Sequence, residues 1–538
     1  MTRGLARAYW EADRSTELVD LTVGQLLADR AGGHPQRVAV VGVRHGTSTS
    51  ARLTYHEVLD ESCRVATALA RLAERGSRIA LWAPNVLEWP IIQYGAALAG
   101  MVLVALNPAL PEDDLFYAVS HSGSTVLIHA DSYRDYAMAE VAARVGARIA
   151  GLRCISLSET SAWRSESADS DRVLGDAPTC SDTIAMLQYT SGTTGRPKGV
   201  VLKHHSLVNV AKLTLEAVGG PDRPVCLNPL PLFHTAGCVI GTLGPLWAAG
   251  TIVLVEQFAP GPVLDALRDE AVDVLFYVPA VLSALVDYQR TSDREPPQLS
   301  VIMGGAAPVD GSLIDAATGL FGAQVYNLYG QTELAPVLTL TRPGDSPEDR
   351  HDTVGRPLPQ VDCKITDPGT GQVARVGEVG EICARGYQQF VGYLHDPEAT
   401  AAALDPDGFV RTGDLGTMDD RGYLRITGRL KEIIIRGGEN IAPARIERIL
   451  AEHDSVLDAV VVGLPDDRLG EIVAAVVTTE SAAAGLKDDL VSHARTRLAR
   501  HEVPAHWYVA THLPVTPTGK VQRFAVRDAI LQGRIDEL

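Results

Sequence analysis

The strongest constraint on the fold is an alternation between short apolar runs and longer segments of helical spacing, which covers most of the first 340 residues. Residues 54–72 (TYHEVLDESCRVATALARL) carry apolar side chains at helical spacing, after a threonine that can cap a helix. Residues 78–82 and 101–105 are strand candidates on either side of a helix that opens at Asn85. This rhythm is typical of βαβ units in a mostly parallel sheet.

The pattern then changes twice along the chain. Residues 345–428 have short strand-like runs separated by Gly, Pro and Asp turns, which predicts a β-rich subdomain. Residues 431–538 mix helical and strand-like segments again. We therefore expect an α/β protein with an N-terminal domain, residues 1–430, of mostly parallel αβ sheets plus the β-rich subdomain. A smaller α+β C-terminal domain follows. The Ser- and Asp-rich residues 156–181 predict a surface loop.

Charge and cysteine content narrow the class of protein. Asp and Glu outnumber Lys and Arg by 66 to 48, a formal net charge of −18, so we expect no nucleic-acid partner. The seven cysteines form no CxxC pair and are odd in number, which favours a reducing, cytoplasmic location over a disulfide framework or a zinc ribbon. The most apolar stretch, residues 91–106, is short and contains Gln93, so we expect no membrane span.

Five short motifs carry the residues suited to chemistry. Residues 190–199 (TSGTTGRPKG) follow an apolar strand candidate and combine glycines, hydroxyls and a lysine, a composition that can wrap a polyphosphate without matching the Walker A spacing. The other four are NLYGQTE at 327–333, RTGDLG at 411–416, GRLKEIIIRGGEN at 428–440 and PVTPTGK at 514–520. Each one alone is more often an ordinary turn, so only their combination is informative.

Together, and in this order, these motifs resemble those of the adenylate-forming enzymes, which include acyl- and aryl-CoA synthetases, nonribosomal peptide adenylation domains and beetle luciferases. The resemblance extends from about residue 53 to residue 523. It implies that a small-molecule carboxylic acid attacks ATP in the presence of Mg²⁺, that pyrophosphate leaves, and that the acyl-adenylate is passed to the thiol of CoA.

The resemblance also implies a nucleotide site. Its phosphate-binding residues would be Thr190, Ser191, Gly192, Thr193, Thr194, Lys198, Thr332 and Glu333. Its adenine- and ribose-binding residues would be Gly305, Ala306, Asn327, Tyr329, Asp414 and Arg429. Glu333 would hold Mg²⁺, because a carboxylate supplies the hard oxygens that this ion prefers.

Catalysis and domain motion are implied for the remaining residues. The catalytic set would be Lys198, Thr332, Glu333 and Lys520. Of these, Lys520 would neutralise charge between the acid and the α-phosphate. Lys431 falls at the hinge position of the family, about which the C-terminal domain would alternate between two poses. Gly437 and Gly438 would line the thiol tunnel after that rotation.

His234, in the run PLFHTAG, falls where the family lines its acid pocket. Amino-acid-activating members generally carry an aspartate at this position, so the histidine argues against amino-acid activation and resembles the gate residue of acyl- and aryl-CoA synthetases. The other pocket candidates are Ala236, Cys238 and Gly304. They are small or apolar, which suits an apolar chain or a ring.

An acyl- or aryl-CoA synthetase is therefore the leading hypothesis, and three alternatives stay open. One is a specialised adenylating enzyme that uses a carrier-protein thiol as acceptor, or an unusual acid such as nitrite for diazotisation of an aryl amine. The others are a luciferase-like oxygenase and an inactive nucleotide-binding module. No motif fixes the identity of the acid or the oligomeric state.

Overall fold

The structure is a computed structural model that describes residues 4–190, 197–436, 439–466, 468–479, 485–515 and 521–538. The chain divides into two compact units. The larger unit comprises Trp10–Cys363 and Ala384–Val410, and the smaller unit comprises Met1–Tyr9, Lys364–Cys383 and Arg411–Leu538. Within the described residues, no helix is both long enough and apolar enough to cross a membrane.

A nine-stranded sheet organises one half of the larger unit, in the order β16-β15-β14-β13-β12-β10-β11-β2-β3. The six strands from β14 to β2 run parallel, and both edges are antiparallel. The strands are β2 (Val38–Val43), β3 (Ser50–Thr54), β10 (Val225–Asn228), β11 (Thr251–Leu254), β12 (Val274–Tyr277), β13 (Val301–Gly305), β14 (Gln324–Tyr329), β15 (Thr339–Leu340) and β16 (Arg356–Pro357).

A seven-stranded sheet organises the other half, in the order β19-β9-β8-β5-β4-β6-β7. Its strands are β4 (Arg78–Trp82), β5 (Val102–Leu106), β6 (Val126–His129), β7 (Arg153–Ser156), β8 (Ile184–Thr190), β9 (Lys198–Lys203) and β19 (Gly392–Tyr393). The five strands from β8 to β7 run parallel, whereas β9 and β19 are antiparallel to their neighbours. The prediction of mostly parallel αβ sheets is therefore confirmed.

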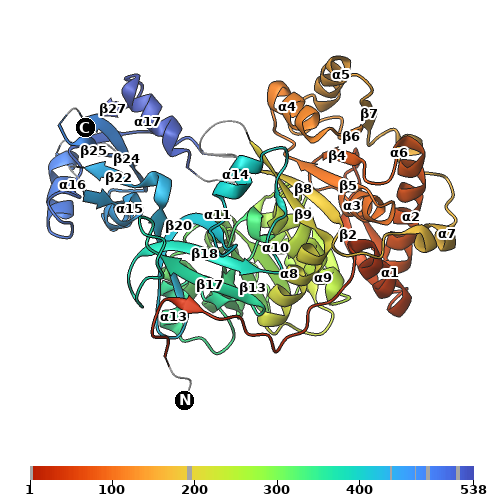
Figure 1. Ribbon diagram of the computed structural model, residues 1–538, viewed down its shortest axis with the longest axis horizontal. Coiled ribbons are helices and arrows are strands. Elements are labelled where there is room, and N and C mark those ends of the chain that lie inside the picture. Colours follow the sequence, from red (N-terminus) through yellow and green to blue (C-terminus); the bar gives the residue numbers. More distant parts are fainter. Residues whose placement is uncertain (1–3, 191–196, 437–438, 467, 480–484, 516–520) are drawn as a thin grey trace. The chain divides into compact units, whose positions relative to one another are not determined.

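Helices connect the parallel strands and pack around them (Figure 1). The predicted helix at 54–72 is present as α2 (Tyr55–Leu72), with Thr54 and Glu57 forming a reciprocal capping box. The others are α1 (Val23–Gly33), α3 (Glu88–Leu98), α4 (Glu112–Ser122), α5 (Met138–Arg148), α8 (His204–Ala217), α9 (Gly241–Trp247), α10 (Pro260–Asp269), α11 (Pro279–Arg290), α12 (Gly311–Phe321), α13 (Pro347–Asp352) and α14 (Pro397–Ala402). Residues 156–181 are not only a loop, because they contain α6 (Thr160–Trp163) and α7 (Ser170–Asp176).

One core cluster joins the nine-stranded sheet to three helices. Leu275 and Ile302 project from β12 and β13, and Leu264, Leu285 and Phe321 project from α10, α11 and α12. All five side chains are buried. Burial of each contributes about 1.5–3 kcal/mol relative to exposure, so this cluster holds β12 and β13 rigidly in place.

The smaller unit contains most of a five-stranded sheet, in the order β1-β17-β18-β20-β21, and the whole of a six-stranded sheet. The strands of the first are β1 (Tyr9–Trp10), β17 (Val361–Thr366), β18 (Gly380–Gly386), β20 (Val410–Met418) and β21 (Leu424–Arg429). Those of the second are β22 (Ile434–Arg436), β23 (Glu439–Ile441), β24 (Asp458–Asp466), β25 (Gly470–Thr478), β26 (His506–Val509) and β27 (Asp536–Glu537).

Helices cover both faces of the six-stranded sheet, which confirms the α+β character of the C-terminal domain. Buried residues of α15 (Pro443–Ala451) and α16 (Leu486–Arg495) pack on one face together with Trp507. Val526 and Ile530 of α17 (Arg523–Leu531) pack on the other. The division at residue 431 and the mobility of this domain stay predictions.

Candidate active site

The turn predicted to flank adenine begins where β13 ends. Gly304 lies opposite Tyr277 of β12 on one side and opposite Asn327 of β14 on the other. A Cβ atom on Gly304 would lie 1.9 Å from the Tyr277 carbonyl oxygen, and one on Gly305 would lie 2.0 Å from the Leu328 carbonyl oxygen. Only glycine fits at both positions, so bare backbone is presented at the carboxyl edge of the parallel strands, where open α/β sheets bind their ligands.

The next residue of this turn carries a side chain in an unusual backbone conformation. Ala306 is exposed and has a φ angle of +71°. A positive φ is uncommon for a residue with a Cβ atom and is often found at binding sites. Gly304 and Gly305 are buried, so Ala306 is the first exposed residue after β13, and its contact with a nucleotide stays a prediction.

Asn327 is buried on β14 and makes hydrogen bonds to the protein on both sides. Its Oδ1 atom accepts a hydrogen bond from the Tyr277 hydroxyl at 2.6 Å, and its Nδ2 atom donates to the Arg350 carbonyl at 3.1 Å. Burial raises the pKa of Tyr277, so its hydroxyl stays protonated and donates. The carboxamide of Asn327 thus fixes the end of β14 in this structure, and its contact with adenine stays a prediction.

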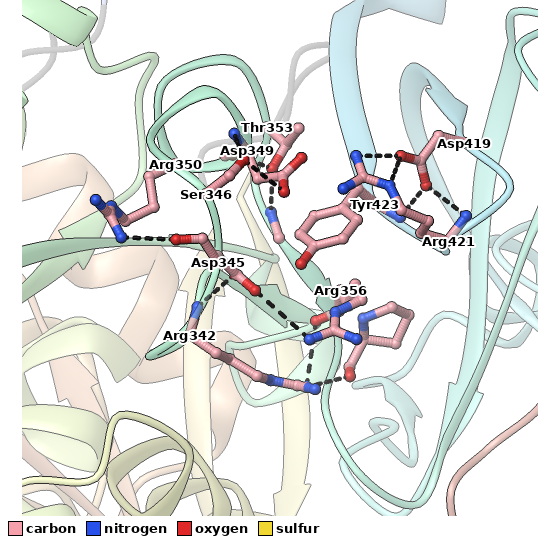
Figure 2. Close-up of polar contacts among 12 residues, drawn as sticks. Arg342, Asp345, Ser346, Asp349, Arg350, Thr353, Arg356, Asp419, Arg421 and Tyr423 are labelled. Atoms are coloured by element: carbon pink, nitrogen blue, oxygen red, sulfur yellow. Dashed lines mark hydrogen bonds and ion pairs between the residues drawn. The ribbon is translucent and has the colours of Figure 1, made fainter. Parts of the chain in front are cut away.

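The loop behind Asn327 is held by a buried carboxylate, which sequence analysis did not single out. The side chain of Asp345 accepts a hydrogen bond from the Arg342 backbone N–H at 2.7 Å and pairs with the Arg356 guanidinium at 3.5 Å. Its carbonyl accepts from Arg350 Nη1 at 2.7 Å. Figure 2 shows the three arginines around this residue. Asp345 therefore fixes the segment whose Arg350 carbonyl meets Asn327.

Lys198 and Glu333, the predicted phosphate and Mg²⁺ residues, are linked through a third side chain. The ammonium group of Lys198 lies 4.7 Å from the ring centroid of Tyr393, and the Tyr393 hydroxyl donates to Glu333 Oε1 at 2.8 Å. Burial and the neighbouring Glu333 carboxylate raise the pKa of Tyr393, so the hydroxyl remains a donor. Sequence analysis missed Tyr393, which lies on a two-residue strand outside the five motifs.

The base of the glycine-rich loop is ordered on both sides. Thr190, the last residue of β8, pairs directly with Lys198, the first residue of β9. The Tyr117 hydroxyl of α4 donates to the Pro197 carbonyl at 3.1 Å. The predicted phosphate residues Ser191, Gly192, Thr193 and Thr194 lie outside the described residues.

The short helix η2 (Thr332–Leu334) places Thr332 beside Glu333 at the carboxyl end of β14, just beyond Tyr329. The hydroxyl of Thr332 and the carboxylate of Glu333 are hard oxygen donors, which are the ligand type that Mg²⁺ takes. The residues present therefore fit this ion, with nucleotide phosphates supplying the other charged oxygens.

In the smaller unit, the structure brings the two predicted ribose residues together. Asp414 of β20 lies directly opposite Arg429 of β21, and Arg429 Nε lies 2.8 Å from Asp414 Oδ1. Asp414 is buried, whereas the Arg429 side chain is half exposed. Lys431, on the following one-turn helix η3 (Leu430–Glu432), is exposed. Gly437, Gly438 and Lys520 lie outside the described residues.

Three of the residues predicted to line the acid pocket, His234, Ala236 and Cys238, lie in or just before a short π-helix, η1 (Ala236–Ile240). The half-buried His234 lies two residues before this helix, and its carbonyl accepts hydrogen bonds from the backbone N–H groups of Gly237 and Cys238, each at 2.9 Å. A Cβ atom on Gly237 would lie 2.2 Å from the Pro231 carbonyl oxygen, so this turn requires glycine. Single π-turns occur frequently at functional sites.

Cys238 is fully buried under this turn and joins it to two buried glutamines. Its Sγ atom accepts a hydrogen bond from Gln188 Nε2 of β8 at 3.4 Å, and its carbonyl accepts from Gln93 Nε2 of α3 at 3.1 Å. Burial raises the pKa of the Cys238 thiol, which therefore stays neutral and unreactive. Because Gln188 lies two residues before Thr190, Cys238 contacts the strand that leads into the glycine-rich loop.

Comparison with known protein families gives two matches that together cover most of the chain. Residues 27–394 match the model described as AMP-binding enzyme, and residues 445–520 match the AMP-binding enzyme C-terminal domain. YngI of Bacillus subtilis (strain 168) is 34% identical over 549 residues, covering 96% of this chain and 98% of YngI. The human mitochondrial medium-chain acyl-CoA ligase ACSF2 is 29% identical, covering 97% of this chain and 89% of ACSF2.

Solved structures give the same similarity. ATP-bound MatB from Rhodopseudomonas palustris has a TM-score of 0.81 and 26% identity, covering 96% of this chain and all of MatB. The o-succinylbenzoate CoA synthetase MenE from Bacillus subtilis, in complex with its acyl-adenylate intermediate, has a TM-score of 0.80 and 27% identity. That match covers 97% of this chain and all of MenE.

Proposed function

The chain belongs to the AMP-binding enzyme family as an adenylate-forming ligase of the acyl-CoA synthetase type, and we propose that it converts a carboxylic acid, ATP and CoA into an acyl-CoA, AMP and pyrophosphate. The arrangement of Lys198, Tyr393 and Glu333 carries this proposal. It joins a cation suited to a phosphate and a carboxylate suited to Mg²⁺ through one side chain, at the base of the glycine-rich loop.

The first step brings two anions together, so the chain must neutralise charge. In the proposed mechanism, Lys198 and the backbone N–H groups of the glycine-rich loop hold the β- and γ-phosphates while the carboxylate attacks the α-phosphorus. Bound Mg²⁺ would supply further positive charge on the phosphates. Lys520 stabilises the charge that develops at the α-phosphate, and loss of such a group typically slows a reaction by about 10² to 10³.

The second step transfers the acyl group to the thiol of CoA. The thiol sulfur attacks the acyl carbon, the bond to the AMP oxygen breaks, and the thiol proton passes to solvent. We propose that the segment after Lys431 rotates between the two steps, so that Lys520 leaves and the loop at Gly437 and Gly438 lines the path of the thiol. Because the mixed anhydride reacts readily with water, exclusion of water during this exchange protects it.

For the acid, we propose an apolar acyl chain of medium length. The candidate pocket residues Ala236, Gly304 and the buried, neutral Cys238 carry no charge. A pocket of this kind favours an apolar substrate over an amino acid or a dicarboxylate. The name of ACSF2, a medium-chain acyl-CoA ligase, supports the chain length. A cytoplasmic location stays a prediction, since ACSF2 is named as a mitochondrial protein.

A pyrophosphate-release assay tests this function. The acids are medium-chain and long-chain fatty acids, benzoate, malonate, o-succinylbenzoate, glycine and nitrite, each run with and without CoA. We expect one turnover with a medium-chain acid alone, and sustained turnover with an acyl-CoA product when CoA is added. Sustained turnover with nitrite and an aryl amine, or only with a carrier protein, would favour the alternative acceptors. No pyrophosphate with any acid would contradict an active enzyme.

A further inference from the structure

We propose that Tyr393 is a positioning residue that orients the Glu333 carboxylate for the metal ion and holds Lys198 beside it. This inference rests on the proposed function, because it takes Glu333 as the Mg²⁺ ligand and Lys198 as the phosphate ligand. Tyr393 would touch neither the acid nor the nucleotide. It would act through the two residues that do.

The side chain of Tyr393 contacts both partners in different ways. Its hydroxyl donates to Glu333 Oε1 at 2.8 Å, and its ring face lies 4.7 Å from the ammonium group of Lys198. A hydrogen bond to one oxygen restricts rotation of the whole carboxylate, so the position of the other oxygen, Oε2, is set as well. Outer-shell partners of this kind determine how well a carboxylate binds its metal ion.

The backbone around Tyr393 is locked to the strand that carries Lys198. Tyr393 pairs with Val200 of β9, and the Leu394 N–H donates to the Gly199 carbonyl at 2.8 Å. The Tyr393 N–H donates to Thr400 Oγ1 at 2.9 Å, which ties the strand to α14. The backbone position from which the Tyr393 side chain extends is therefore fixed relative to Lys198.

The same segment also holds the main chain of Glu333. The backbone N–H of Phe390 donates to the Glu333 carbonyl at 2.9 Å, and the Phe390 ring lies edge-on to the Tyr393 ring at 5.1 Å. Backbone and side chain of Glu333 are thus both bound by residues 390–393. The bond from Phe390 is enough to hold the main chain of Glu333. The bond from Tyr393 ends on the carboxylate instead, which favours a role for Tyr393 in orienting that carboxylate.

The ring of Tyr393 provides a place for Lys198 before the nucleotide binds. An ammonium group over an aromatic face is attracted by the electrons of the ring, but less strongly than by a phosphate group. When the nucleotide binds, the ammonium group of Lys198 can therefore leave the Tyr393 ring and contact a phosphate oxygen with only a small movement. Removal of the hydroxyl and removal of the ring should then have separable effects, on metal binding and on ATP binding respectively.

Two variants separate these effects. Tyr393→Phe keeps the ring and removes the hydroxyl, and it should weaken the binding of Mn²⁺ in the presence of ATP about tenfold or more. Its KM for ATP at saturating Mg²⁺ should stay close to that of the parent enzyme. Tyr393→Leu should in addition raise the KM for ATP. Tyr288→Phe, at an exposed tyrosine of α11, is the matched control and should change neither quantity.

Metal binding is measured directly by electron paramagnetic resonance of Mn²⁺ with ATP and no acid present, so this readout does not depend on turnover. Thermal unfolding is recorded for every variant. A merely structural role would lower the unfolding temperature of Tyr393→Phe and leave the dissociation constant of Mn²⁺ unchanged, which would overturn the proposal.

A double-mutant cycle tests whether Tyr393 acts through Glu333. Glu333→Gln should weaken Mn²⁺ binding, and addition of Tyr393→Phe to this variant should weaken it no further. Additive losses would overturn the inference. If the parent enzyme binds no Mn²⁺ with ATP, the proposed function fails and the inference fails with it. If the parent binds the ion and Tyr393→Phe binds it equally well, only the inference fails.

Discussion

His204, the first residue of α8, provides a pH-dependent test of how the larger unit is held together. Its side chain is buried, and its Nδ1 atom accepts a hydrogen bond from the Val23 backbone N–H at 3.2 Å. Burial lowers the pKa of His204 from 6.5 to about 4. A protonated Nδ1 cannot accept this bond, so the neutral ring is part of the contact between α1 and α8.

The sign and size of the effect follow from this shift. Between about pH 6.5 and pH 4, the unfolded chain binds a proton at His204 that the folded chain does not bind. Stability is therefore fully present above this window and falls as the pH falls through it. One pKa unit corresponds to about 1.4 kcal/mol, so acidification from about pH 7.5 to pH 5 should remove about 2 kcal/mol through this residue alone.

Urea unfolding followed by tryptophan fluorescence measures the loss, with His204→Asn as the matched variant. The asparagine Oδ1 atom can accept the Val23 N–H bond but does not titrate. Because other groups titrate equally in both proteins, the comparison isolates His204. The parent should lose about 2 kcal/mol more than the variant between about pH 7.5 and pH 5. An equal loss in both proteins would refute the account of His204 as a buried neutral acceptor.

Four further substitutions test the candidate site. Gly304→Ala places a Cβ atom 1.9 Å from the Tyr277 carbonyl oxygen, so thermal and urea unfolding should show a loss of about 1–3 kcal/mol together with weaker ATP binding. Asp414→Asn breaks the ion pair with Arg429, and calorimetric titration should show ATP binding weakened about tenfold, with the fold intact. His234→Asp introduces an unpaired carboxylate, so steady-state kinetics should show poorer use of an apolar acid and no gain of amino-acid activation. Lys520→Ala should slow adenylate formation about 10² to 10³-fold in single-turnover assays, but not thioester formation from a supplied acyl-adenylate. Equal slowing of both half-reactions would contradict the proposed domain rotation.

The parts of this fold that the sequence predicts are those with a long periodic signal. The helix at 55–72 has one buried face and a capping threonine, and both features are visible in the order of residues. Most of the parallel strands are nearly continuous apolar runs, because the elements packed on a parallel sheet bury both of its faces. Gly304 lies within the last two residues of β13, and Asn327 and Tyr329 lie in the second half of β14, so these strands extend into the motifs that the sequence singles out.

Short elements, and residues whose role depends on one contact with a distant part of the chain, cannot be predicted from sequence periodicity. Helices α6 and α7 are too short for a periodic pattern, and α6 is anchored by one buried residue, Trp163, whose indole N–H donates to the Leu157 carbonyl at 3.0 Å. Tyr393 lies 60 residues from Glu333 and has meaning only once β19 pairs with β9. The local sequence shows only a tyrosine after a glycine, Gly392-Tyr393, and this pair does not identify Glu333 or Lys198 as its partners.

The transfer of oxygen from the acid to AMP tests the central claim most directly. In the proposed reaction a carboxylate oxygen bonds to the α-phosphorus and stays on AMP when the thiol of CoA takes the acyl group. With a medium-chain acid labelled with ¹⁸O in its carboxylate, mass spectrometry should therefore find one ¹⁸O atom in AMP and none in pyrophosphate. Unlabelled AMP, or label in ADP or inorganic phosphate, would show that the carboxylate does not attack the α-phosphorus and would contradict the account.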